Sequence, residues 1–569
     1  MKKWKIIGNK TPSATLKEKD IVSMLLKNRG LATKKEIEQF LHPPDPHTLT
    51  AKDVGVDPKS LAKALKRLDK AIKEKESIVV YADYDADGIT AGAIMWETLY
   101  KLGALVMPYI PHRVEEGYGL SHKGIDAVKE QYNPSLIVTV DHGITAWEKV
   151  EYAKSLGIDV IVTDHHVKPA SPVGGPEKLP KCTMVHTTKL CGAGVSWFVA
   201  KELVETFPLS PSPFSRELLA LACIGTIADM VPLIGPNRSI VKYGLAALNK
   251  THRVGLDALI VDAGLTKGFL STYDVSHIIA PRLNAMGRLV HAMDALRLLC
   301  TKQEDKAMLL ARKLGLTNKE RQQMTIDTSL HAKDIVSVRI KNNHHKKLLF
   351  VAHEEYNQGV IGLVAGKLVE EFYRPAIVVA KGEVISKASA RSISGFNIVE
   401  AIRTCSDILV DVGGHPMAAG FTVETAHLSE LQDRLEALAE KELTEESLTR
   451  VLRIDTELPL AKANEALWQA LRDFEPFGFG NMEPVFATRG VTIVDVRLVG
   501  AEGKHLKLQI ASPFTLPPSP LSYDAIAFGF GELYPKLRPD KPIDIAYSID
   551  MNVWNGNRKL QLKIKDILL

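Results

Sequence analysis

Three apolar runs rich in β-branched residues lie between residues 77 and 163, and amphipathic stretches separate them. The runs are "SIVVYA" (77–82), "SLIVTV" (135–140) and "DVIVT" (159–163). Short apolar runs that alternate with helical patterns are typical of a parallel sheet whose strands are connected by helices. We therefore expect an α/β domain built on these three strands.

The hydrophobic pattern changes again further along the chain. Beyond Pro232 the spacing of amphipathic helices dominates to about residue 330, and strand and helix patterns resume at "KKLLFVA" (346–352). From about Arg453 short strands alternate with Gly, Pro and Asn turns, which predicts a small closed barrel of the OB type, with a minimal β-sandwich as the alternative. The predicted division is an N-terminal helical segment (1–55), a first α/β domain (56–235), a helical connector (236–335), a smaller second α/β domain (336–445) and a β-barrel domain (446–569).

Acidic residues and histidines follow each of the first three strands. Asp83, Asp85 and Asp87 follow the first strand, Asp141 follows the second, and Asp164, His165 and His166 follow the third. Because the carboxyl ends of parallel strands meet at one edge of a sheet, we expect these side chains to converge. An extended backbone would place the first three acids along one wall of that site. A further acid, Asp229 in "IGTIADMVPL", is a candidate for the same site.

This combination of side chains predicts a metal centre. Three like charges two residues apart repel one another unless a cation lies among them, and carboxylates with imidazole and no thiolate favour Mn²⁺ or Mg²⁺. Two such ions about 3.5–4 Å apart can hold and hydrolyse a phosphoryl group. A solvated loop or a calcium site is the alternative for the first acidic run alone, but the twelve-residue calcium loop ending in Glu is absent.

Composition narrows the class of protein. The chain has 569 residues, 45% of them hydrophobic and 24% charged, with a formal net charge of only +5, a weak indication of an anionic partner. Its five cysteines form no CxxC pair, which argues against a disulfide framework and fits a reducing cytoplasm. No run of about 18 apolar residues could span a membrane. We expect a cytoplasmic protein without a membrane segment.

The ordered motifs resemble a known superfamily. "DYDADG", "DHG", "DHH" and "GTIADMVPL" are similar to the four motifs of the DHH phosphoesterases, although Tyr81 stands where many members carry His. "RVEEGYGL", "CGAGVSW", "PRLNAMGR", "KASARSISGFNI", "GGHPMAAGF" and "PFGFGNMEPVF" extend the resemblance over the whole chain to the RecJ family of single-strand-specific 5′→3′ DNA exonucleases. The resemblance implies a DHH catalytic domain at 56–235, a DHHA1-type domain at 336–445 and an OB-fold at 446–569.

The resemblance also implies roles for individual residues. The implied metal ligands are Asp83, Asp85, Asp87, Asp141, His165 and Asp229. The implied catalytic residues are Asp87, Asp141, Asp164, His165 and His166, with His166 beside the scissile phosphate and Asp164 either orienting a histidine or acting structurally. The implied substrate-binding residues are Arg113, Tyr118, Arg282, Arg288, Ser389, Arg391, Gly414 and His415.

Several of these assignments have alternatives. Ser389 and Arg391 lie two residues apart on one side of a predicted strand, and an Arg fork suits phosphate oxygens, so the pair is expected to hold a 5′-phosphate; solvated charges are the alternative. An arginine of "PRLNAMGR", Arg282 or Arg288, could instead form a salt bridge between two domains. Tyr118 could be ordinary packing.

The implied function is metal-dependent hydrolysis of single-stranded DNA to mononucleotides in repair and recombination. The implied partners are single-stranded DNA with a 5′ end, a helicase and a single-strand-binding protein, and a monomer is the expected oligomeric state. The alternatives are a nanoRNase-like phosphodiesterase that acts on short oligonucleotides and an inactive single-strand-binding scaffold. The presence of every acid and histidine of the predicted site argues against the scaffold.

Overall fold

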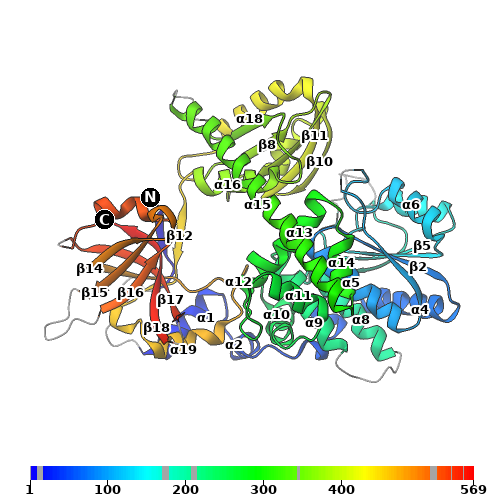
Figure 1. Cartoon of the computed structure of the whole chain (residues 1–569), viewed down its shortest axis with the longest axis horizontal. Coiled ribbons are helices and arrows are strands. Elements are labelled where there is room, and N and C mark those ends of the chain that lie inside the picture. The colour runs from blue at the N-terminus through cyan, green and yellow to red at the C-terminus, as the bar shows by residue number, and fades with distance from the viewer. Residues whose placement is uncertain are drawn as a thin grey trace. The chain divides into compact units, whose positions relative to one another are not determined.

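The computed structural model describes residues 2–8, 17–113, 115–168, 178–206, 214–341, 346–512, 522–539, 541–554 and 557–569. The chain divides into two compact units (Figure 1). The larger unit comprises Pro43–Glu442 with Gly478–Gly480, and the smaller unit comprises Met1–His42, Leu443–Phe477 and Asn481–Leu569. Within the described residues, no helix is long and apolar enough to cross a membrane.

The first sheet of the larger unit has five parallel strands in the order β3-β2-β4-β5-β6. The strands are β2 (Ser77–Ala82), β3 (Leu105–Tyr109), β4 (Leu136–Val140), β5 (Asp159–Asp164) and β6 (Thr183–His186). The predicted parallel sheet is therefore confirmed, and the three strands expected from the apolar runs are adjacent at its centre. Their carboxyl ends meet at one edge.

Helices cover both faces of this sheet, which explains why its strands are apolar on both sides. Ile78 and Val80 of β2 point into one core, and Val79 and Tyr81 point into the other. The first core is formed with α4 (Pro58–Lys73), α5 (Ala86–Lys101), α8 (Gly192–Thr206) and α9 (Phe214–Ala228). The second core is formed with α6 (His122–Tyr132) and α7 (Trp147–Ser155).

A helical connector follows, as the amphipathic pattern predicted. It contains α10 (Gly235–Leu248), α11 (Val254–Asp262), α12 (Thr272–Asp274), the π-helical segment η2 (Val275–Ile279), α13 (Ala280–Leu289), α14 (Met293–Cys300) and the 38-residue α15 (Glu304–Lys341). Most of these helices bury their apolar faces in the first core, so the connector is packed structure and not a linker.

The second α/β domain of the larger unit has a mixed five-stranded sheet in the order β10-β11-β9-β8-β7. Only β7 and β8 are parallel. Its elements are β7 (Leu349–His353), α16 (Ile361–Phe372), β8 (Ala376–Ala380), β9 (Ile385–Arg391), α17 (Ile398–Arg403), β10 (Leu409–His415), β11 (Ala418–Glu424) and α18 (Leu428–Glu442).

The smaller unit contains a closed barrel, which confirms the OB-type prediction over the β-sandwich. Its strands are β14 (Phe486–Val499), β15 (His505–Ala511), β16 (Ser522–Ala527), β17 (Ile543–Trp554) and β18 (Asn557–Leu568). The sheet closes because β14 pairs with both β15 and β17. A short β13 (Thr456–Glu457) extends it beside β14.

The N-terminal residues belong to the same unit as the barrel. Strand β1 (Lys3–Ile6) pairs in parallel with β12 (Val451–Ile454), while α1 (Glu18–Asn28) and α2 (Lys34–Leu41) bury Leu25 and Phe40 in the core shared with α19 (Glu465–Leu471) and the barrel. The five-part division with boundaries at 55, 235, 335 and 445 stays a prediction.

A buried ion pair links the first domain to the connector and gives a testable stability prediction. Arg253 donates to Glu97 Oε2 and to the Leu299 carbonyl, both at 2.7 Å, and the Arg253 and Glu97 side chains are 6% and 11% exposed. Glu97→Gln leaves the guanidinium without its counter-charge, so we expect the free energy of unfolding to fall by about 3–5 kcal/mol in urea titrations.

The control removes the other cation on the same carboxylate. Lys101 Nζ lies 3.1 Å from Glu97 Oε1, and its side chain is 32% exposed. We expect Lys101→Ala to lower the free energy of unfolding by less than about 1 kcal/mol. Equal losses for the two variants would contradict the assignment of the stability to the buried pair.

Candidate active site

The acidic run after β2 is a strand end followed by a helix start, and not the extended wall expected from the sequence. Strand β2 ends at Ala82 and α5 begins at Ala86, so helical geometry replaces the expected spacing. Asp85 is the N-cap residue of α5, and its Oδ1 accepts a hydrogen bond from the Gly88 N–H at 3.0 Å. Asp87 lies in the first turn of α5, and Asp83 is buried in the short loop between β2 and α5.

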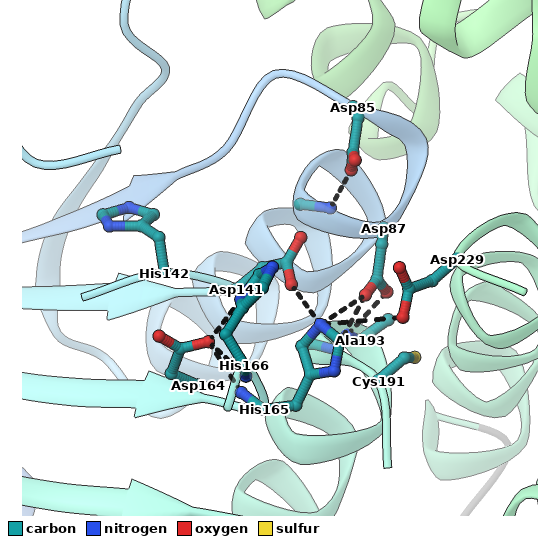
Figure 2. A network of polar contacts seen from close by, with 12 residues as sticks. Asp85, Asp87, Asp141, His142, Asp164, His165, His166, Cys191, Ala193 and Asp229 are labelled. Carbon is teal, nitrogen blue, oxygen red and sulfur yellow. Dashed lines mark hydrogen bonds and ion pairs between the residues drawn. The ribbon is translucent and has the colours of Figure 1, made fainter. Parts of the chain in front are cut away.

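Asp87 is fixed by the start of another helix. Its Oδ2 accepts from the Gly192 N–H at 2.7 Å and its Oδ1 from the Ala193 N–H at 2.8 Å. These N–H groups belong to the first turn of α8, where backbone donors lack partners within their own helix and favour a negative charge. The side chain is therefore held between the starts of α5 and α8 (Figure 2).

Asp141 and His165 meet at the carboxyl edge of the sheet. Asp141 follows β4 with a left-handed backbone (φ +68°), a conformation that Asp tolerates better than most residues and that often occurs at functional sites. Its Oδ1 lies 3.1 Å from Nε2 of His165, and the same nitrogen lies 3.6 Å from Asp229 Oδ2 and 3.9 Å from Asp87 Oδ2 (Figure 2).

All six metal ligands that the resemblance implies belong to three groups of side chains. Within each group, the potential ligand atoms lie within 4.8 Å of one another. The groups are Asp141 with His165 and His166; Asp87 with His165 and Asp229; and Asp83 with Asp85 and Asp141. Asp141 and His165 each belong to two groups, so the three groups form one continuous centre. That geometry could hold more than one cation.

Two further observations fit a cation at this centre. Among the residues that the structure describes, Asp141 Oδ1 and His165 Nε2 are buried polar atoms without a hydrogen-bond partner. Burial, and then the neighbouring carboxylates, raise the pKa of Asp83, Asp85 and Asp141, and raise the pKa of Asp229 to about 9. Carboxylates this crowded are poorly stabilised as anions by the protein alone, and hard divalent cations bind such oxygen-rich sites.

Asp164 organises the loop after β5. Its Oδ1 accepts from the backbone N–H groups of His165 and His166, and its Oδ2 accepts from the Ile144 N–H at 2.8 Å. The same carboxylate contacts Nδ1 of His166 at 2.8 Å. Asp164 therefore has a structural role and also orients a histidine, and that histidine is His166, not the ligand candidate His165.

The Asp164 contact also decides the charge of His166. Burial lowers the pKa of His166, but the hydrogen bond and charge of Asp164 outweigh it and raise the pKa to about 9. Burial raises the pKa of Asp164 in turn, and the His166 contact and the backbone donors outweigh it, so the carboxyl titrates below its usual range. The His166 Nε2 lies 3.4 Å from the Tyr118 hydroxyl. The His166 ring is nearly parallel to the ring of His415 in the second domain, with 6.3 Å between the ring centroids.

Four arginines lie near one another beside this centre. Arg288 is buried, and burial followed by the charges of Arg113, Arg321 and Arg391 lowers its pKa to about 10. Arg391 donates to Ser389 Oγ at 3.2 Å, which confirms that the two side chains meet. Repulsion among such cations is relieved by an anion, so the cluster suits a phosphate group.

The remaining predicted substrate residues lie in different surroundings. Tyr118 is 55% exposed beside His166, so it is not ordinary core packing. Arg282 donates to the Ile278 carbonyl, and its Nε lies 3.9 Å from Asp262 Oδ2. It therefore forms an ion pair, as its alternative predicted, but the pair lies within the connector and does not join two domains. Gly414 lies in strand β10 opposite Ala419, and the next residue, His415, ends that strand.

Sequence reasoning missed three contributors to the site. In the sequence Arg321 belongs to a stretch with an amphipathic helical pattern, and Gly192 belongs to the motif "CGAGVSW", so neither pattern indicates a role in the site. His142 of the motif "DHG" follows Asp141 directly; it is buried and its Nε2 donates to the Tyr81 carbonyl at 3.0 Å, while burial lowers its pKa to about 4. Tyr81 itself packs with Tyr109 and His142 in the second core.

Comparison with known proteins shows the same order of domains. Residues 77–226 match the sequence model of the DHH family N-terminal domain, residues 345–441 match that of the DHHA1 domain, and residues 454–566 match that of the RecJ OB domain. The chain is 38% identical to the single-stranded-DNA-specific exonuclease RecJ of Bacillus subtilis, covering 96% of this chain and 67% of that protein. It is 32% identical to the RecJ of Escherichia coli, covering 96% and 95%.

The chain belongs to the RecJ family. A solved structure of RecJ from Thermus thermophilus in complex with Mn²⁺ superposes with a TM-score of 0.81 at 30% identity, covering 100% of this chain and 79% of that one. A Mg²⁺ complex of RecJ from the same organism gives 0.73 at 29% identity, covering 99% and 78%. The first α/β domain is thus the DHH domain of the family, and the second is its DHHA1 domain.

Close packing around the centre predicts an effect of adding a methyl group at Gly192. A Cβ there would lie 2.3 Å from Asp141 Oδ1, so the RecJ-family chain needs glycine at the start of α8. We expect Gly192→Ala to weaken Mn²⁺ binding by at least about 10-fold, measured by calorimetry, because it displaces Asp141 and the donors to Asp87.

Gly366→Ala is the matched control, since it lies in helix α16 and its Cβ would meet nothing within 4 Å. Mn²⁺ affinity should be unchanged in this variant. An unchanged affinity in Gly192→Ala as well would show that the close approach does not shape the centre.

Proposed function

We propose that this chain is a metal-dependent exonuclease that hydrolyses single-stranded DNA in the 5′→3′ direction to mononucleotides. The observation that carries the proposal is the convergence of Asp83, Asp85, Asp87, Asp141, His165 and Asp229 in one centre at the carboxyl edge of the sheet. The relatives named above are single-stranded-DNA-specific exonucleases, and the 5′→3′ direction is the one the sequence resemblance implies.

The proposed cofactors are Mn²⁺ or Mg²⁺, held by those six residues. When bound, a pair of these ions supplies Lewis-acid stabilisation of the phosphate oxygens and acidifies a water molecule for attack on phosphorus. The oxygen-rich ligand set and the two metal complexes of the Thermus thermophilus protein support this choice.

His166 is proposed to contact the scissile phosphate. Asp164 fixes its Nδ1, so Nε2 is the atom that remains to donate a hydrogen bond, and it lies on the side of Tyr118 and His415. Asp164 thereby sets the orientation of the ring, and its charge favours the doubly protonated form, in which both ring nitrogens are donors. A phosphate there would lie between the metal centre and the DHHA1 domain, where Tyr118 can stack on a base.

The arginine cluster is proposed to bind the 5′-phosphate. Arg391 and Ser389 provide a guanidinium fork and a hydroxyl, and Arg113 and Arg288 add positive charge. Arg113 stacks over the Tyr84 ring at 4.9 Å, which holds its side chain beside the acidic loop. Arg282, Gly414 and His415 stay proposed contacts to the nucleic-acid backbone.

The family resemblance supports the biological setting. We propose that the OB domain binds the single strand, that a helicase and a single-strand-binding protein cooperate in repair and recombination, and that the protein is a cytoplasmic monomer. All five cysteines are free thiols, which fits a reducing compartment. A nanoRNase-like activity and an inactive scaffold are not favoured, because the chain carries the RecJ OB domain and the complete set of ligand candidates.

The direct test uses a long single-stranded DNA labelled at either end, incubated with Mn²⁺, Mg²⁺ or EDTA. We expect mononucleotides from the 5′ end, none with EDTA, and little attack on a blunt duplex. Asp141→Ala should lower the rate at least about 100-fold, because it removes a residue common to two ligand groups. Cleavage restricted to oligomers of about two to five nucleotides would favour the nanoRNase-like alternative, and binding without cleavage the scaffold.

The 5′-phosphate pocket has its own prediction. Arg391→Ala should lower kcat/KM on 5′-phosphorylated DNA by about 10–100-fold through a higher KM, since a charged hydrogen bond is worth about 1.5–3 kcal/mol. DNA with a 5′-hydroxyl should be affected much less.

Arg403→Ala removes the same charge from the DHHA1 domain at an exposed ion pair with Glu400 and serves as the control. The same loss on both DNA ends would count against a 5′-phosphate contact at Arg391.

A further inference from the structure

The motif "PRLNAMGR" contributes more than its two arginines. It forms α13, which the π-helical segment η2 precedes, and α13 packs against the start of α5. Both helices, which are labelled in Figure 1, belong to the larger unit. The start of α5 is the segment that carries Asp85 and Asp87.

Asn284 of α13 makes a specific hydrogen bond to that segment. Its side-chain Oδ1 accepts from the Ala86 N–H at 2.7 Å. Ala86 is the first residue of α5, and the first N–H groups of a helix have no acceptor within the helix. Asn284 therefore satisfies a donor that lies between the two ligand candidates Asp85 and Asp87.

A second contact one turn later holds the same loop. A Cβ on Gly287 would lie 2.4 Å from the Tyr84 carbonyl oxygen, so only glycine permits this approach. Residues three apart lie on one face of a helix, and Asn284 and Gly287 thus present one face of α13 to Tyr84 and Ala86. The loop from Asp83 to Asp85 is clamped between its own sheet and α13.

The end of α13 also contacts the DHHA1 domain. Arg288 Nη1 donates to the Gly359 carbonyl at 3.1 Å, and a Cβ on Gly359 would lie 2.4 Å from the Arg288 carbonyl oxygen. One short helix therefore touches both the acidic loop and the loop before α16.

We propose that Asn284 is a positioning residue of the metal centre, which fixes the first turn of α5 so that Asp85 and Asp87 keep their places. The inference rests on the proposed function, because it takes these two acids as metal ligands. Only three residues separate β2 from α5, so a displaced helix start would move both carboxylates.

The test measures Mn²⁺ affinity by electron paramagnetic resonance, together with kcat and KM on single-stranded DNA. Asn284→Ala is expected to bind Mn²⁺ about 10–100-fold more weakly and to lose kcat with little change in KM. Asn249→Ala is the control: Asn249 makes three side-chain hydrogen bonds within the connector, to Leu245 and Leu270, so its loss should lower Tm but leave Mn²⁺ affinity unchanged.

A second substitution tests the hydrogen bond itself. Ala86→Pro removes the N–H that donates to Asn284 Oδ1. Proline is compatible with this site because it is common at the first position of a helix, and the extended backbone of Asp85 (φ −92°, ψ 177°) is the conformation that a residue before proline prefers. In the double variant Asn284→Ala/Ala86→Pro no donor is left unsatisfied, and the proline ring fixes φ of the first helical residue in place of the lost hydrogen bond, so we expect most of the Mn²⁺ affinity to return. A general packing role for Asn284 predicts no such recovery.

Each outcome bears on one proposal. Wild-type protein that neither binds Mn²⁺ nor degrades DNA would overturn the proposed function. Normal Mn²⁺ affinity in Asn284→Ala, or a double variant no better than the single one, would overturn the role of Asn284 alone. If Asn284→Ala does not fold, Asn284→Ser, whose hydroxyl is too short to reach Ala86, provides the same comparison.

Discussion

The crowding of carboxylates at one edge of a parallel sheet is the constraint on which the site depends. Asp83 and Asp141 are buried in one group of acids, and neither burial nor the repulsion from neighbouring carboxylates favours their charged forms. The chain compensates for only part of this cost. Asp87 receives two backbone N–H groups from α8, whereas Asp141 Oδ1 faces His165 without a hydrogen bond among the described residues. Bound divalent cations would supply the positive charge that stabilises the remaining carboxylates.

Close backbone approach makes that crowding possible. Glycine at 192 lets the start of α8 reach Asp141, and glycine at 287 lets α13 reach the Tyr84 carbonyl. In both cases a helix contacts a loop that carries ligand candidates, so the positions of the acids are set by rigid elements and not by the loops alone. The centre is therefore preorganised by packing that extends into the connector.

A cluster of four arginines accompanies the acidic centre. Arg113 comes from the DHH domain, Arg288 and Arg321 from the connector, and Arg391 from the DHHA1 domain. Three parts of the larger unit thus combine to form one cluster next to the acidic centre. The proposed substrate, an anionic polymer with a terminal phosphate, would complement both features, because metal ions would neutralise one group of its oxygens and arginines another.

The sequence by itself determined the fold class and the three central strands, favoured a closed barrel over a β-sandwich, and predicted that acids and histidines gather at one edge of the sheet. These follow from local pattern: apolar runs specify strands, and the ends of parallel strands necessarily share an edge. The tertiary structure decided what local pattern does not contain. It made Asp85 an N-cap residue, assigned Asp164 to His166, added Arg321 to the cluster and placed Asn284 on Ala86, 198 residues away. Each of these depends on contacts between segments distant in the chain, and such contacts leave no periodic signal in the sequence.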